Sequence, residues 1–156
     1  MTKIIRSTAL LILITVLVVG IGSCKKDTAA VAKSKTELLT QSNWKIVKEE
    51  SKTGTGAWVD NTSTLACEKD NNIVFRTNAT LELNEGATKC NPTDPQISGT
   101  GTWSFLTSET QLQVVVTGSP SAFIYSLDQL DENTLVISRS ETIGGITESE
   151  RITLGH

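Results

Sequence analysis

The chain has 156 residues and a formal net charge of −3, a length typical of one ordinary domain. The first 23 residues hold Lys3 and Arg6 and no acid, so the remainder carries 12 basic and 17 acidic groups, a net charge of −5. This acidic balance, with no cluster of basic residues in the body of the chain, argues against a nucleic-acid-binding surface.

The first 23 residues have the organisation of a bacterial export signal. Basic residues precede an apolar run from Ala9 to Val19, and small residues follow it. The apolar run is shorter than the roughly 20 residues that a membrane-spanning helix needs. We therefore expect residues 1–23 to be a signal peptide that is removed.

The segment Ile21-Gly22-Ser23-Cys24 resembles the lipobox of bacterial lipoproteins. The resemblance implies that the thiol of Cys24 receives diacylglycerol and that its freed amine receives a further acyl chain, such as palmitate. Each buried methylene contributes roughly 0.8 kcal/mol, so several chains together anchor a protein to a membrane permanently. The alternative is an ordinary secretion signal in which Cys24 is incidental.

Residues 24–35 are small and polar without periodicity, which predicts a lipidated flexible tether. Within it, Lys25-Lys26-Asp27 resembles the short tag that exports some Bacteroidota lipoproteins to the cell surface. A solvated charged linker is the alternative. The expected location is the cell envelope, anchored in the outer membrane on either its periplasmic face or the cell surface.

A short helix is predicted at residues 35–41, where Leu38 and Leu39 would cover one end of a sheet. Beyond it the dominant hydrophobic period is two, as in residues 79–84, where Ala79, Leu81 and Leu83 share one face. Segments with this character are rich in β-branched and aromatic residues. They are residues 44–50, 73–77, 79–84, 100–105, 111–117, 122–129, 135–140 and 146–154, with 58–65 as a further candidate.

Turn-forming residues separate these segments, including Thr77-Asn78, residues 131–133 and Gly144-Gly145. They predict an all-β domain over residues 36–156, built as a single antiparallel up-and-down meander of eight or nine strands. Such a sheet must hide its edges, and we expect it to close into a barrel, with a sandwich as the alternative.

Five short segments, in their order and spacing, resemble the lipocalin-like lipoproteins of Bacteroidota. The likeness covers residues 36–154 and implies a lipocalin-like β-barrel domain. The lipocalin signature places Gly two residues before the first-strand Trp, where this chain has Ser42, which indicates a looser relative of the transport lipocalins. The segments are residues 42–45, 67–71, 85–92, 101–103 and 130–135.

With Cys24 lipidated, Cys67 and Cys90 remain in an oxidising compartment, where an even pair predicts a disulfide. Closing such a loop contributes about 3 kcal/mol. A zinc site is the alternative, but zinc sites combine Cys with His. The only His is His156 at the end of the sequence, in a segment that we expect to fray, so we expect neither a metal nor a cofactor.

The three tryptophans are the candidate ligand-binding residues. Trp44 and Trp103 are expected to pack across the barrel floor, as the first-strand Trp does in the resembled family, with ligand stacking as the alternative role. Trp58 follows a Gly-rich stretch, residues 53–57. It is expected either to lie at the rim of a cavity or to be tucked under a mobile loop.

No catalytic residues are identified. Nucleophilic catalysis by Ser or Cys needs a neighbouring base, and no partner for one is evident. Glu148 and Glu150 share a face of a predicted strand, but the polar Ser149 and Arg151 beside them indicate a solvated outer surface. We therefore expect that the protein is not an enzyme.

An eight-stranded barrel leaves room for one small ligand. The sequence therefore favours a membrane-anchored, monomeric binding protein for a small apolar or amphipathic molecule. The alternative is a structural or protein-interaction lipoprotein with a solid core, acting through loops such as residues 85–98, which carry Pro92 and Pro95 and are pinned at Cys90.

Overall fold

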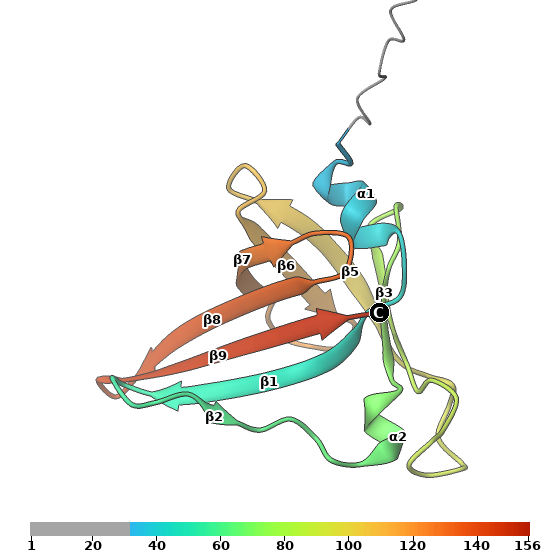
Figure 1. Cartoon of the computed structure of the whole chain (residues 1–156), viewed down its shortest axis with the longest axis horizontal. Helices are drawn as coiled ribbons and strands as arrows, with labels where there is room; N and C mark the ends of the chain where they lie inside the picture. The colour runs from blue at the N-terminus through green and yellow to red at the C-terminus, as the bar shows by residue number, and fades with distance from the viewer. Residues whose placement is uncertain (1–31) are drawn as a thin grey trace, which may run out of the picture. The chain divides into compact units, whose positions relative to one another are not determined.

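Nine β-strands form a single antiparallel sheet in the computed structural model, which describes residues 32–156 (Figure 1). The predicted signal peptide, Cys24 and most of the predicted tether lie outside the described residues. The strand order is β2-β1-β9-β8-β7-β6-β5-β4-β3. The elements are α1 (Lys35–Thr40), β1 (Lys45–Thr53), β2 (Val59–Asp60), α2 (Ala66–Lys69), β3 (Asn72–Phe75), β4 (Thr80–Asn84), β5 (Ile97–Leu106), β6 (Gln111–Val116), β7 (Phe123–Leu130), β8 (Leu135–Ile143) and β9 (Ile146–Gly155).

The all-β, up-and-down meander predicted from the sequence is confirmed. From β3 to β9 each strand pairs with the next one along the chain, and β9 then pairs with β1. The predicted Gly144-Gly145 hairpin is one of these connections. Both glycines have positive φ angles, 61° and 82°, as a type I′ turn requires, and Ile143 pairs with Ile146 across it.

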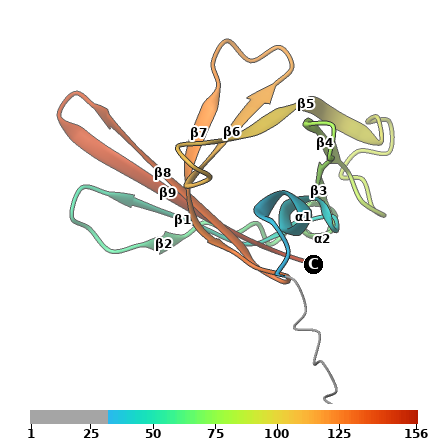
Figure 2. The same ribbon diagram turned by 90° about the horizontal axis from the view of Figure 1, so that it is seen from above.

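The predicted helix is confirmed as α1. It begins at a capping box in which the Ser34 hydroxyl accepts a hydrogen bond from the Glu37 main chain and the Glu37 carboxylate accepts one from the Ser34 main chain. Its Leu39 is fully buried and packs with the inward-facing residues of the sheet. Figure 2 shows α1 lying inside the curve of the sheet.

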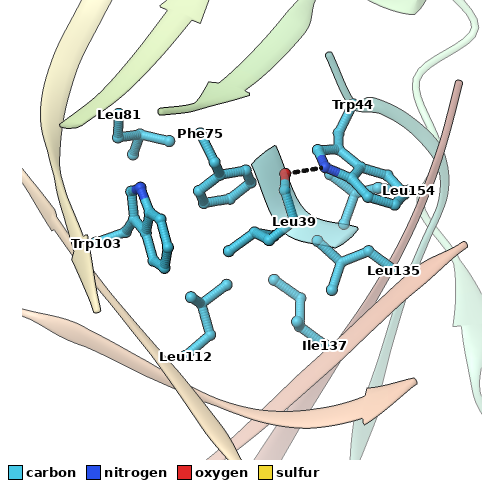
Figure 3. Close-up of a cluster of buried hydrophobic side chains, with 9 residues drawn as sticks. All are labelled: Leu39, Trp44, Phe75, Leu81, Trp103, Leu112, Leu135, Ile137 and Leu154. Atoms are coloured by element: carbon cyan, nitrogen blue, oxygen red, sulfur yellow. Dashed lines mark hydrogen bonds between the residues drawn. The ribbon is translucent and has the colours of Figure 1, made fainter. Parts of the chain in front are cut away.

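One face of the sheet, here called the inner face, carries the hydrophobic core (Figure 3). Its residues alternate with outward-facing ones along each strand, so the two-residue period of the sequence is the direct cause of this burial. The buried cluster consists of Leu39, Trp44, Phe75, Leu81, Trp103, Leu112, Leu135, Ile137 and Leu154.

The sheet is not closed into the predicted barrel, because strand pairing joins its two ends at a single isolated bridge. Trp44 and Ile73 form an isolated bridge between the start of β1 and β3, with N–H to O distances of 2.9 and 2.7 Å. Further along β1, Glu50 and Ser51 pair instead with β2. The β2 segment thus occupies the edge of β1 that a closed barrel would pair with β3, and the two ends of the sheet diverge beyond the bridge (Figure 2).

Three local predictions need correction. Ala79 does not belong to a strand: its φ of 64° places it in the turn before β4, and an L-residue takes this conformation only in turns. The candidate strand at residues 58–65 is reduced to the two residues of β2. His156 does not fray, because its ring centroid lies 4.1 Å from that of Trp44.

Candidate ligand cavity

An apolar cavity of about 180 Å³ lies on the inner face of the sheet. Eleven of its twelve lining side chains have no polar atom, and Tyr125 is the exception. Six strands each contribute two residues, separated by one outward-facing residue, so the alternating pattern builds the wall directly. The lining is Ile73, Phe75, Leu81, Leu83, Val114, Val116, Phe123, Tyr125, Leu135, Ile137, Ile152 and Leu154.

The floor beside the cavity is rigidly packed around two tryptophans. Trp44 has no exposed surface, and its Nε1 donates to the main-chain oxygen of Leu39 at 2.9 Å (Figure 3). Trp103 donates from Nε1 to the main-chain oxygen of Arg76 at 3.0 Å. Its ring meets that of Phe75 edge to face at a centroid distance of 6.0 Å. Both indole N–H groups are therefore satisfied inside the fold, as buried tryptophans require.

The open end of the inner face is polar. Cross-strand pairing places Ser51, Glu150 and Arg139 side by side on β1, β9 and β8. Glu150 is the next inward-facing residue of β9 after the apolar Ile152, in the direction of the β8–β9 hairpin. The next row pairs Glu148 directly with Glu141. These residues line a hollow of about 150 Å³, here called the acidic mouth: Ser51, Arg139, Glu141, Glu148 and Glu150, with Ser149 at its edge.

Arg139 lines the acidic mouth and also lies close to two rings of the apolar cavity. Its Nε and Nη2 lie 3.0 and 2.9 Å from the same carboxylate oxygen, Oε2 of Glu150. Its guanidinium carbon lies 5.3 Å from the centre of the Phe123 ring and 5.8 Å from that of Tyr125, both of which line the cavity. These are cation–π distances, so the aromatic wall favours positive charge at this boundary. The hydrogen bonds that Arg139 donates to Glu150 also raise the pKa of Arg139.

Tyr125 is the polar group of the cavity lining. Burial raises the pKa of its phenol, and the negative charges of Glu150 and Glu49 raise it further, against the opposing effect of Arg139. The phenol therefore stays protonated at neutral pH and is able to donate. Among the described residues its hydroxyl has no hydrogen-bond partner, so this donor is available to a molecule in the cavity.

A second hollow, of about 260 Å³, lies at the divergence between β1 and β3. Ile46 and Glu49 of β1 line it together with Ile73 of β3 and residues of the connection through α2. Ile73 also lines the apolar cavity, so the two spaces are separated at this point by one side chain.

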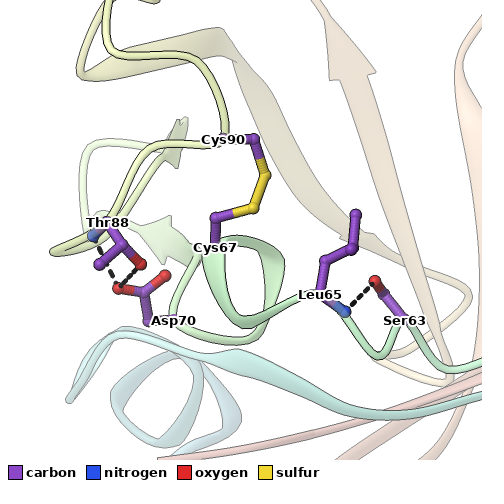
Figure 4. Close-up of a disulfide and its surroundings, with 6 residues drawn as sticks. All are labelled: Ser63, Leu65, Cys67, Asp70, Thr88 and Cys90. Atoms are coloured by element: carbon purple, nitrogen blue, oxygen red, sulfur yellow. Dashed lines mark hydrogen bonds between the residues drawn. A yellow bond between two sulfur atoms is a disulfide. The ribbon is translucent and has the colours of Figure 1, made fainter.

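The predicted disulfide between Cys67 and Cys90 is confirmed, with a Cα–Cα distance of 5.1 Å. It links α2, before β3, to the loop after β4, as the β3–β4 hairpin requires. Hydrogen bonds beside the disulfide join the same two segments and are here called the second clasp (Figure 4). Oδ2 of Asp70 accepts from the main-chain N–H and the hydroxyl of Thr88, both at 2.8 Å. These bonds lower the pKa of Asp70.

None of the three candidate tryptophans lines the cavity. Trp44 and Trp103 are buried in the core, in agreement with the expectation that they pack in the floor. Trp58 lies on the outer face of the sheet, with its ring centre 4.4 Å from the guanidinium carbon of Arg151 and 4.8 Å from Nζ of Lys52. Arg151 faces outward because its neighbours along β9 face the cavity and the acidic mouth. The expectation of a rim position for Trp58 is therefore wrong, and a ligand-binding role has no geometric support in any of the three.

The outward orientation predicted for Glu148 and Glu150 is also wrong. They share the inner face with Ile152 and Leu154, while Ser149 and Arg151 face outward. Arg139, Phe123 and Tyr125 were not predicted from the sequence as site residues. The only signal in the sequence is for Phe123 and Tyr125, whose spacing of two residues places them on one face of β7.

Within residues 32–156, no group of three or more His, Cys, Asp and Glu side chains is placed to hold a metal ion. No helix in this part of the chain is long and apolar enough to cross a membrane. The predicted lipidation of Cys24 lies outside the described residues. Comparison of the sequence with protein-family models and with curated proteins finds no match.

Proposed function

We propose that the protein is a non-enzymatic, lipocalin-like lipoprotein that binds a small apolar or amphipathic molecule within its curved sheet. In this proposal Cys24 carries the lipid that anchors it to the outer membrane. One observation supports the binding function above the rest: the twelve lining side chains surround an apolar hollow of about 180 Å³ beside the packed core. An apolar hollow with few polar groups is the usual form of a small-molecule site.

The cavity volume limits the ligand. Typical pockets for drug-sized ligands measure about 300–1,000 Å³, whereas an apolar cavity of about 150 Å³ holds benzene. A space of about 180 Å³ therefore fits one aromatic ring or a short alkyl chain. A long fatty acyl chain is too large for it.

Benzene is a suitable probe of the cavity itself. A probe that binds only the folded state raises its stability by about 1.4 kcal/mol at ten times its Kd, and Tm rises accordingly. The Val114→Phe variant places a larger side chain into the cavity and should abolish the rise in Tm. The Val115→Phe variant, on the outward side of the same strand, should keep it. The cavity proposal fails if the wild-type protein shows no rise, or if Val114→Phe responds as Val115→Phe does.

A second candidate function is recognition of a protein through the loop between β4 and β5. One observation favours it: the loop has a fixed conformation. Cys90 ties it to α2, Glu85 donates its main-chain N–H to Gln96 at 3.0 Å, and Nζ of Lys89 donates to the oxygen of Asp94 at 2.7 Å. A solvated surface that is held in one shape is suited to partner binding.

A further inference from the structure

We propose that the ligand is a small amphiphilic amine, with its phenyl or short alkyl group in the apolar cavity and its ammonium group in the acidic mouth. This inference depends on the proposed binding function and adds the class of head group. It rests on the proximity of two hollows of opposite character, which Arg139 brings within cation–π distance of each other. Arg139 lines the acidic mouth and stacks near Phe123 and Tyr125, which line the cavity.

The charges of the acidic mouth favour a cation. Glu141, Glu148 and Glu150 line the mouth together with one guanidinium, that of Arg139, which gives a formal charge of −2. The guanidinium of Arg139 is already paired, because its Nε and Nη2 both donate to one oxygen of Glu150, Oε2. Among the described residues the other oxygen of Glu150 has no hydrogen-bond donor. An ammonium group would supply one.

Glu141 and Glu148 strengthen this preference. They pair directly across β8 and β9 on the inner face, and like charges in directly opposed positions repel. The hydroxyl of Thr53 donates to Oε2 of Glu148 at 2.9 Å, but it carries no charge to offset the repulsion. A cation between the two carboxylates relieves the repulsion. A carboxylate head group, as in a fatty acid, would add to it.

Tyr125 offers a further contact at the boundary. The guanidinium of Arg139 already lies over the rings of Phe123 and Tyr125, and the Tyr125 hydroxyl offers an oxygen that can accept a hydrogen bond from an ammonium group. Each half-exposed ion pair of this kind changes affinity by about two- to fivefold. Two pairs together predict that an amine binds about tenfold more tightly than the corresponding alcohol.

Three probes with the same ring test the head group: 2-phenylethylamine, 2-phenylethanol and 3-phenylpropanoate. Their Kd values are measured by equilibrium dialysis against the purified full-length protein in phosphatidylcholine nanodiscs, with protein-free nanodiscs as the blank. We expect the amine to bind most tightly and the carboxylate most weakly. Added salt should reduce the advantage of the amine over the alcohol, because the mouth is open to solvent.

The Glu148→Gln variant removes one negative charge and retains an oxygen for the Thr53 hydroxyl. It should weaken amine binding by about threefold, strengthen carboxylate binding, and leave the alcohol unchanged. The matched control is Glu109→Gln, in the exposed turn between β5 and β6, whose main-chain oxygen contacts the start of α1 at the other end of the sheet. This control should leave all three Kd values unchanged.

The outcomes separate the two proposals. If none of the three probes binds, both the cavity function and the amine assignment fail. If all three bind with similar Kd values, or if the carboxylate binds most tightly, the cavity function stands and the amine assignment is overturned. An equal loss of amine affinity in Glu148→Gln and Glu109→Gln would also overturn it, because the effect would then not come from the mouth.

Discussion

Removal of the disulfide should destabilise the protein mainly through the unfolded chain. Cys67 and Cys90 are 23 residues apart, and the loop-closure entropy of a cross-link over this separation corresponds to about 3.5 kcal/mol at 25 °C. In the folded state the same two segments are also held by the bonds from Ala87 and Thr88 to Asp70. The native geometry should therefore survive without the bridge.

The double variant Cys67→Ser/Cys90→Ser is the appropriate perturbation, because single variants leave a free thiol. Urea unfolding should give a free energy of unfolding about 2–3.5 kcal/mol below that of the oxidised protein, with Tm lower by roughly 10 °C. The dependence on urea should steepen, since an unfolded chain without a cross-link exposes more surface. Unfolding of the reduced wild-type protein should match the variant.

Two results would refute this reasoning. A change in unfolding free energy below about 0.5 kcal/mol would show that the unfolded chain holds the two segments close without the bridge. A loss well above about 5 kcal/mol, the upper end of measured disulfide effects, would show that the bridge also maintains native contacts. In that case the bonds to Asp70 are not a sufficient second clasp, and Asp70→Asn should then have little effect in the double variant.

Three further predictions concern the floor, the outer face and the clasp. Trp44→Phe loses a buried indole hydrogen bond and leaves a void, so its free energy of unfolding should fall by about 2–4 kcal/mol in a urea titration. The pKa of Glu50 is lowered by hydrogen bonds from a lysine and an arginine, so its stabilising effect is present above its unfolded pKa of about 4.3 and is lost as pH falls through the lower folded value. Tm should therefore fall in this acid range, and less steeply in Glu50→Gln. Gly86→Ala should cost more than the roughly 1–2 kcal/mol expected of a left-handed residue alone, because its new Cβ would overlap the Asp70 carbonyl, whereas Gly118→Ala, which faces open space, should cost only that amount.

Local patterns predicted the secondary structure well. The two-residue period located strands β3 to β9, and the Gly144-Gly145 pair located the last hairpin. Both features are set by residues that are close together in the sequence, so the sequence alone reveals them. The disulfide was predictable for a related reason, since a hairpin between its two cysteines brings them together whatever the rest of the fold does.

The β1–β3 divergence was not predictable, because it is a competition between distant segments. The edge of β1 that would close a barrel is taken at Glu50 and Ser51 by β2, only two residues long. No periodicity marks so short a strand. The residue before it, Trp58, packs on the outer face against Arg151, about ninety residues further along the chain, and such a long-range contact leaves no local signal.

The orientation of Glu148 and Glu150 was predicted wrongly because alternation determines which residues share a face of a strand but not which face points inward. Glu148 and Glu150 share a face with each other and also with Ile152 and Leu154. Their polarity suggested an outer surface, whereas their register with the two apolar residues places them inside. Following the alternation along the whole of β9, from Leu154 back to Glu148, gives the observed orientation.

The mouth and the divergence have a common cause in the unequal lengths of the strands. Strands β1, β8 and β9 have nine, nine and ten residues, whereas β3 and β4 have four and five. The long strands therefore extend past the point where β3 and β4 can face them. Their inner residues beyond Ile137 and Ile152 have no opposing wall and must tolerate water, which accounts for the charged row that begins at Arg139 and Glu150. The same excess length leaves most of β1 without β3 as a partner, so that β2 covers its edge. An apolar cavity that is open at a charged end follows from this mismatch, and it is the geometry that an amphipathic ligand requires.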